Sequence, residues 1–281
     1  GNDYTKEIIN FKTLGMPIDE RIIFINHNIS LGELDNMNYL LRLCNSEWFT
    51  WLADDDLMHK DFLKTMLKNI NNNDRILASY SNFSTGILFD TIKKNINETK
   101  IEKFNFKTFI QKYVSHKIKL IGCYGLIRTN ILKKLGGHPK LGNSFGPYSD
   151  AILPILISSE GSILWEDTKL VFLRTHKNSL SVKSSNLEAY SSSEEDFIFI
   201  ISKLMIANKF NKSFKNYIYY KLIVWFTHNT TNVLKRNKKI NIIKKLLFFF
   251  RKKFLEDIKY ISFKFKIIYT IKILYLAYKI F

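Results

Sequence analysis

The sequence has few cysteines, no long apolar run and, towards its C-terminus, almost no acidic side chains. Two cysteines, Cys44 and Cys123, cannot build a disulfide framework, which favours a reducing compartment. No apolar stretch reaches the roughly 18–20 residues that a helix needs to span a bilayer, so we expect no simple transmembrane anchor. The first residues, Gly1-Asn2-Asp3-Tyr4-Thr5, lack the basic and apolar segments of a signal peptide.

Positive charge is concentrated at one end of the chain. The 281 residues include 43 Lys+Arg and 25 Asp+Glu, a formal net charge of +18. Residues 201–281 hold 19 of the basic side chains and only two acids, Glu256 and Asp257. The first 200 residues therefore carry 24 basic and 23 acidic groups and are nearly neutral. Any attraction to a polyanion or an anionic membrane is expected to lie in the tail.

Hydrophobic periodicity predicts alternating strands and helices before the tail. We expect buried strands at 21–25, 47–53, 75–83, 118–127, 163–164 and 169–173. Helices are expected at 36–44, 60–70, 106–114 and 149–159, and Pro154 fits the last only in its first turn. This order is typical of an α/β fold with a mostly parallel sheet flanked by helices. We therefore expect an α/β domain over 1–185 and a helical region, rich in Lys and aromatics, over 186–281.

Three consecutive carboxylates, Asp54-Asp55-Asp56, directly follow the predicted strand at 47–53. Open parallel sheets place their ligands at the carboxyl ends of strands. One or two carboxylate oxygens can hold Mg²⁺ or Mn²⁺ there, with substrate phosphates completing the coordination. The alternative is a solvated helix start in which the acids favour the helix dipole.

The context of these aspartates resembles the nucleotide-sugar half of family 2 glycosyltransferases, which have the GT-A fold. The resemblance lies in Asn28-x-x-x-Gly32, Asn38 and Leu52-Ala53-Asp54-Asp55-Asp56. It implies that Asn38 and Asp54 bind the nucleotide-sugar, and that Asp55 holds the metal on the diphosphate. Asp56 would support this site and join the metal ligands. Ala53 stands where the family often has its first Asp, so the assignment within the triplet stays open by one position.

The second half of the α/β region carries further similarity to this family. Leu135-Gly136-Gly137-His138 resembles its Gly-Gly-Phe turn, and Ser149-Asp150 followed by Gly161 resembles its Glu-Asp pair, which makes Asp150 the catalytic base. Glu166-Asp167 is the second choice. The segment 174–181 resembles the family's closing motif, in which Arg174 would bind the nucleotide-sugar and His176 the metal. We expect His138 and His59 at the surface, and Tyr124 could stack on a sugar ring.

The resemblance implies an inverting bacterial enzyme of surface polysaccharide synthesis. The donor would be a nucleoside diphosphate sugar, with UDP-sugars favoured, the acceptor a glycan or lipid-linked glycan, and the cofactor Mn²⁺ or Mg²⁺. The basic tail would place the enzyme in the cytoplasm, peripherally at the inner face of the plasma membrane. The family's first strand, first helix and most of its second strand would be missing from this chain.

Two other classes stay open at this point. A non-catalytic basic protein could bind membranes or nucleic acid through the tail, although the neutral α/β half carries no nucleic-acid motif and we expect no nucleic-acid partner. A metal-dependent nucleotidyltransferase would share the acidic triplet. It would not account for the spacing from Asp150 to Gly161 or for the segment 174–181.

Overall fold

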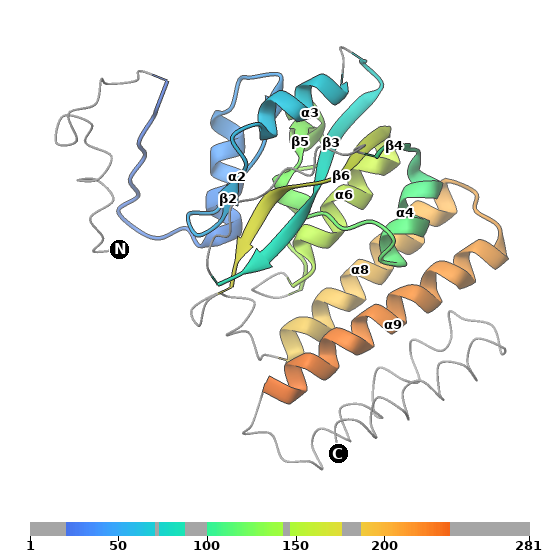
Figure 1. Cartoon of the computed structure of the whole chain (residues 1–281). Coiled ribbons are helices and arrows are strands. Elements are labelled where there is room, and N and C mark those ends of the chain that lie inside the picture. Colours follow the sequence, from blue (N-terminus) through green and yellow to red (C-terminus); the bar gives the residue numbers. More distant parts are fainter. Residues whose placement is uncertain (1–20, 71–72, 88–99, 143–146, 176–186, 237–281) are drawn as a thin grey trace.

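The computed structural model describes residues 21–70, 73–87, 100–142, 147–175 and 187–236, and a mixed sheet flanked by helices forms its centre (Figure 1). The strands follow the order β1-β5-β3-β6-β2, and β4 pairs with β6. The strands are β1 Trp48–Phe49, β2 Leu57–Met58, β3 Ile76–Gly86, β4 Ile101–Phe104, β5 Leu126–Arg128 and β6 Ser162–Arg174. The helices are α2 Glu33–Leu43, α3 Phe62–Ile70, α4 Phe106–Val114, η1 Gly122–Tyr124, α5 Thr129–Lys134, α6 Ser149–Glu160, α8 Leu187–Ala207 and α9 Lys212–Arg236. The α/β class is confirmed.

The strand pairing is mixed instead of mostly parallel. Within the described sheet only β3 and β6 run parallel, and the other pairs are antiparallel. The long strands β3 and β6 form the middle, and the first six residues of β3 are all buried, as expected for a strand covered on both faces. The remaining strands are only two to four residues long and come from segments that reverse direction against this central pair.

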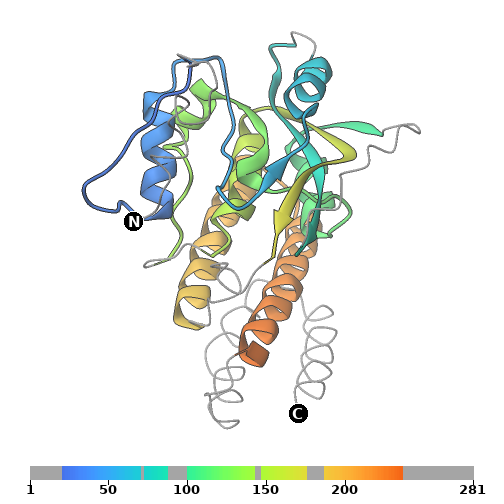
Figure 2. The ribbon, with the colours of Figure 1, turned by 60° about the vertical axis from the view of Figure 1, so that its left-hand side comes forward.

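Several predicted strands differ from the observed ones. The apolar run at 21–25 is no strand: Ile23 is 80% exposed, and Figures 1 and 2 show this segment apart from the sheet. No strand in the described part of the chain pairs with it, and an apolar run without a ladder partner has no β-structure to join. The strand expected at 118–127 is divided into η1 and β5, and those at 163–164 and 169–173 are one strand, β6.

The helices follow the sequence pattern more closely. Helix α4 spans the predicted residues, and its N-cap Asn105 accepts a hydrogen bond from the backbone N–H of Thr108. Helix α2 spans Glu33–Leu43 and so begins before the predicted range of 36–44. Pro154 lies inside α6, beyond its first turn, so the expected placement is wrong. A proline there removes one helical hydrogen bond, and the carbonyl of Asp150 loses its donor.

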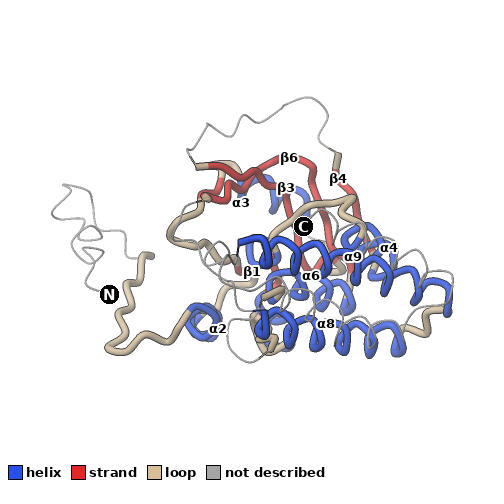
Figure 3. Tube along the Cα trace, turned by 90° about the horizontal axis from the view of Figure 1, so that it is seen from below, coloured by secondary structure: helices blue, strands red, loops and turns tan. Residues whose placement is uncertain are grey.

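Helices α6, α8 and α9 lie together on one side of the strands (Figure 3). Helix α9 packs against both α8 and α4. An aromatic cluster lies here: the ring centroids of Tyr113 in α4 and Trp225 in α9 are 5.9 Å apart, and those of Tyr148 and Phe226 are 4.9 Å apart. These side chains join the hydrophobic core beneath the sheet. Among the described helices, none is long and apolar enough to cross a membrane. The helical prediction for 237–281 lies outside the described residues.

Candidate active site

The acidic triplet forms a turn between β1 and β2. Asp54 is exposed, while Asp55 and Asp56 are partly buried. Asp56 fixes this turn to two distant elements: one carboxylate oxygen accepts from the Tyr124 hydroxyl at 2.5 Å, and the other accepts from the backbone N–H of Arg174 at 2.9 Å. Burial raises the pKa of Tyr124, so the phenol keeps the proton that it donates. The turn is therefore held from η1 on one side and from the end of β6 on the other.

Asp150 lies in the first turn of α6, where the positive end of the helix dipole favours a carboxylate. Its side chain is 54% exposed, and its Oδ1 lies 2.8 Å from Nε2 of His138, whose side chain is almost fully buried. Crowding by protein atoms acts to raise the pKa of Asp150. The hydrogen bond and charge of His138, together with a hydrogen bond from the Cys123 thiol, outweigh this effect, and the pKa is lowered. Asp150 is thus an accessible, ionised carboxylate.

Asp150 and the acidic turn belong to one electrostatic neighbourhood. Glu33, at the start of α2, connects them: its pKa is raised by burial first and then by the negative charges of Asp150 and Asp55, against an opposing contribution from His138. Carboxylates that influence one another in this way repel unless a cation or a positively charged partner is present. The site therefore has the charge that a cationic ligand requires and a separate carboxylate that can accept a proton.

Comparison with known proteins finds a family model that is similar to the first part of the chain. The model of the family described as Glycosyl transferase family 2 matches residues 1–136. This match covers slightly less than half of the 281 residues. No curated protein matches the chain at the sequence level.

Three solved structures of S. aureus TarS have a similar fold. The chain matches TarS 1–349 with a TM-score of 0.56 at 12% identity, over 94% of this chain and 70% of that one. It matches TarS 1–349 in complex with UDP-GlcNAc with a TM-score of 0.54 at 11% identity, over 94% and 71%. TarS itself matches with a TM-score of 0.58 at 11% identity, over 94% of this chain and 42% of that one. At these identities the likeness shows the fold, and the GT-A prediction is confirmed.

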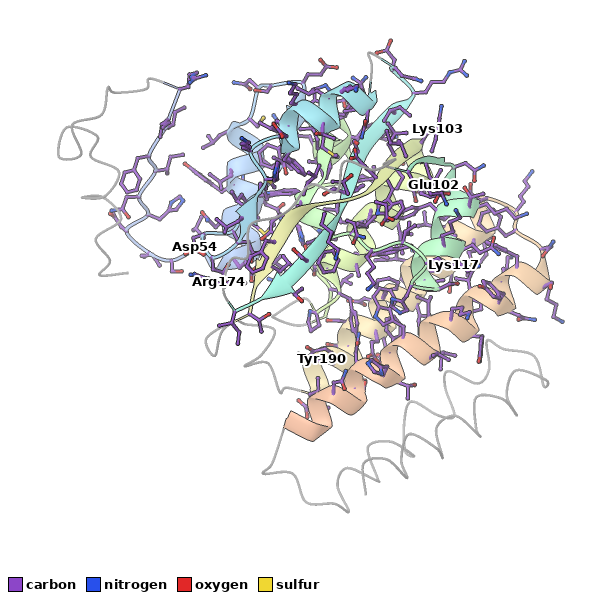
Figure 4. The ribbon with its side chains drawn as sticks, in the orientation of Figure 1. Asp54, Glu102, Lys103, Lys117, Arg174 and Tyr190 are labelled. Atoms are coloured by element: carbon purple, nitrogen blue, oxygen red, sulfur yellow. The ribbon has the colours of Figure 1, made fainter. Side chains whose placement is uncertain are left out.

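Two of the residues predicted to bind the nucleotide-sugar make structural hydrogen bonds. The Asn38 amide grips the backbone of His138: its Oδ1 accepts from the His138 N–H at 2.6 Å, and its Nδ2 donates to the His138 carbonyl at 3.0 Å. Arg174 holds Asp56 through its backbone N–H, while its side chain is exposed. Figure 4 places Arg174 beside Asp54 at the same end of the sheet. Their roles in donor binding remain predictions.

The metal assignment rests on the acidic turn alone. Within the described part of the chain, no group of three or more His, Cys, Asp or Glu side chains could hold a metal ion. Both oxygens of Asp56 accept protein hydrogen bonds, which favours its supporting role over direct ligation. His176 lies outside the described residues. Coordination of a cation by Asp54 and Asp55 remains a prediction.

The second choice for the base lies in different surroundings. Glu166 is buried and accepts from Asn69 of α3 at 2.5 Å, and Asp167 accepts from Asn82 of β3 at 2.9 Å. Neither hydrogen bond involves the acidic turn or α6. These bonds give Glu166 and Asp167 a place in the packing of β6 against its neighbours.

Sequence reasoning misjudged or missed three residues around the site. His138 is 3% exposed and hydrogen-bonded to Asp150, so its surface placement is wrong. His59 is also mostly buried, and its Nδ1 accepts from the Asp61 N–H at 3.1 Å. Glu33 was not singled out, although it directly follows Gly32 of the matched segment. For His138, the available signal was that it replaces the phenylalanine of a Gly-Gly-Phe turn. An apolar residue at that position indicates burial, and a polar replacement there needs a polar partner.

Proposed function

We propose that the chain is an inverting glycosyltransferase in which Asp150 is the general base. It would transfer the sugar of a nucleoside diphosphate sugar to a hydroxyl of a glycan or lipid-linked acceptor in surface polysaccharide synthesis. The observation that carries the proposal is the ionised, accessible Asp150 at the start of α6, in the same electrostatic neighbourhood as the acidic turn. A nucleotide-sugar transfer needs these two elements: a proton acceptor on one side and a place for the diphosphate on the other.

In this mechanism Asp150 takes the proton of the acceptor hydroxyl as the hydroxyl oxygen attacks the anomeric carbon. The new bond forms as the bond from that carbon to the diphosphate oxygen breaks, and its electron pair leaves with the nucleoside diphosphate. With a single base and in-line attack, the configuration at the anomeric carbon inverts, by analogy with inverting glycoside hydrolysis. A base must be ionised to accept a proton, and the lowered pKa of Asp150 keeps it so at neutral pH.

Asp55, with Asp54 beside it, would hold a divalent cation, Mn²⁺ or Mg²⁺. Oxygen ligands from one or two carboxylates are what these hard cations take when substrate phosphates supply the rest. When bound, the cation neutralises the negative charge that develops on the leaving diphosphate. Asp56 keeps the turn in place through Tyr124 and the backbone of Arg174.

A UDP-sugar is the proposed donor class. The fold that this chain shares with TarS, which has been solved with UDP-GlcNAc, supports this choice. We further propose that the tail from residue 201 onward associates with an anionic membrane surface, because it contains 19 basic residues and only two acidic ones. Cations near an anionic leaflet contribute about 1 kcal/mol each. The enzyme would then act peripherally at the inner face of the plasma membrane, beside a lipid-linked acceptor.

The decisive experiment compares Asp150→Asn with Asp167→Asn in the full chain, using a panel of UDP-sugars with Mn²⁺ or Mg²⁺. We expect Asp150→Asn to lower transfer by about 100-fold or more, in keeping with the 10²–10⁴-fold contribution of general-base catalysis. Asp167→Asn keeps an isosteric side chain away from the acidic turn and should stay near the wild-type rate. NMR of the product should show the inverted anomer. Transfer that survives Asp150→Asn and disappears with Asp167→Asn would refute the assignment of the base.

The same assay separates catalysis from membrane binding. Asp55→Ala should abolish metal-dependent transfer and leave binding to vesicles of anionic phospholipid unchanged. If instead Asp55→Ala altered vesicle binding while no donor was ever consumed, the chain would be a binding protein and not an enzyme.

A further inference from the structure

We propose that His138 is a positioning residue for Asp150: it holds the carboxylate in one orientation and in its ionised form for proton abstraction. The inference rests on the proposed role of Asp150 as the base and extends it to a second residue. His138 itself is buried, so it is expected to act only through Asp150 and not to touch the substrates.

The His138 ring is fixed before it meets Asp150. The Asn38 side chain, 100 residues earlier in the chain, forms hydrogen bonds with both the backbone N–H and the backbone carbonyl of His138. Trp51 packs edge-on against the imidazole with ring centroids 5.6 Å apart, and its indole N–H donates to the Met37 carbonyl at 3.0 Å. The imidazole therefore has little rotational freedom, and its Nε2 is aimed at Asp150 by contacts that do not involve Asp150.

The two ring nitrogens of His138 have unequal surroundings, which assigns its proton. Nδ1 is buried and has no hydrogen-bond partner among the described residues, whereas Nε2 faces the carboxylate at 2.8 Å. A proton on Nδ1 would leave a buried N–H unsatisfied and would set the Nε2 lone pair against the negative oxygen. In either charge state of the ring, Nε2 therefore carries a proton and donates it to Oδ1 of Asp150.

Asp150 needs such a partner because more than half of its side chain is exposed. An exposed carboxylate samples several rotamers, and each wrong rotamer moves the base away from the attacking hydroxyl. With Oδ1 held by His138, we expect Oδ2 to receive the acceptor's proton. The helix N-terminus and His138 also favour the ionised form over the repulsion of nearby acids. The titratable groups within electrostatic reach of Asp150 are Glu33 of α2, Tyr80 of β3, Tyr113 of α4, Cys123 of η1 and His138.

The test uses two substitutions at His138 in the full chain. His138→Phe keeps an aromatic ring against Trp51 and removes the donor, whereas His138→Gln keeps a donor of similar reach. We expect His138→Phe to lower kcat by about 10- to 100-fold, the range that misplacement of a catalytic group produces, with the donor KM little changed. Since the pKa of Asp150 would rise without its donor, the acidic limb of the kcat/KM profile should move to higher pH. His138→Gln should restore part of both effects.

Two controls separate positioning from folding. His228→Phe, at an exposed site on α9, makes the same chemical change away from Asp150 and should leave the profile unmoved. Thermal unfolding of each variant reports any loss of fold. If His138→Phe lowered activity without moving the acidic limb, or if His138→Gln failed to rescue a stably folded protein, the positioning role would be wrong.

A second measurement needs no turnover. Long-range ¹H–¹⁵N NMR of the six histidines should show His138 with its proton on Nε2, and Asp150→Asn should shift that resonance more than any other. A proton on Nδ1, or a resonance indifferent to Asp150→Asn, would overturn the inference even if Asp150 proved to be the base. Conversely, full activity of Asp150→Asn with the expected histidine spectrum would refute the proposed base and leave the hydrogen bond intact.

Discussion

Gly122 is the position at which the fold most directly constrains Asp150. A methyl group added there would lie 1.9 Å from the Asp150 carbonyl oxygen and 2.9 Å from Cδ of Pro154. The approach is possible because Pro154, four residues after Asp150, has no N–H to occupy that carbonyl. In Gly122→Ala, η1 and the start of α6 would have to separate by about 1.5 Å to reach ordinary van der Waals contact at 3.4 Å.

This displacement should affect stability and activity together. Forcing an extra methyl group into packed structure costs roughly 1–3 kcal/mol, and a shift of about 1 Å in a catalytic group costs about 100-fold in rate. We expect Gly122→Ala to lower the free energy of unfolding by that amount, measured in urea. The kcat for sugar transfer should fall by about 100-fold. The donor KM should rise as well, because Tyr124 of η1 also holds the acidic turn through Asp56.

Gly136→Ala is the matched control. A methyl group at Gly136 meets nothing within 4 Å, but its φ of +82° is in the left-handed region that disfavours alanine. This variant should lose about 1 kcal/mol of stability through backbone strain and keep its kcat. If Gly122→Ala had the same free energy of unfolding and the same kcat as the wild type, the close approach of η1 to Asp150 would be wrong. The explanation of that approach by Pro154 would then be wrong as well.

Three further variants probe the supports of the site. Tyr124→Phe removes the hydrogen bond to Asp56 and should lower the free energy of unfolding by about 2 kcal/mol. It should also weaken metal-dependent binding of UDP, measured by calorimetry. Unchanged binding would show that Asp56 does not hold the acidic turn in place. Asn38→Ala removes two hydrogen bonds to the His138 backbone and should lower the free energy of unfolding by about 2–4 kcal/mol. A loss of UDP affinity larger than the loss of kcat would instead favour the predicted role of Asn38 in binding the nucleotide-sugar. Because the pKa of Glu33 is raised in the folded protein, its ionisation opposes folding, and this opposition is relieved as the pH falls through the folded pKa. Glu33→Gln should therefore raise the melting temperature at neutral pH and reduce the stabilisation seen on mild acidification; a lower melting temperature at neutral pH would contradict this.

Local patterns account for much of what the sequence predicted correctly. Helix α4 lies where the sequence predicted it, because apolar spacing at the helical period is a property of residues close together in the chain. The order of the motifs around Asp54–Asp56 and Asp150 predicted the family, since each motif is a short run that can be recognised without its neighbours in space. The separation of a neutral α/β half from a basic tail follows from counting charges.

The predictions that were wrong concern features that depend on partners far away in the sequence. The run at 21–25 has strand composition, but a strand exists only when another strand pairs with it, and the described sheet offers none. Pro154 was expected in a first turn because a proline costs an interior hydrogen bond. The structure tolerates it inside α6, where the freed Asp150 carbonyl meets the backbone at Gly122 instead.

The sequence by itself determined the fold class and the candidate aspartates, because motif, periodicity and charge are local quantities. Only the tertiary structure decided how those aspartates are held. The partners of Asp56 lie 68 and 118 residues away, and the grip of Asn38 on His138 spans 100 residues. Such contacts form when the packing of α2, η1, α6 and β6 brings their side chains together. His138, which the sequence placed at the surface, became the buried partner of the proposed base for this reason.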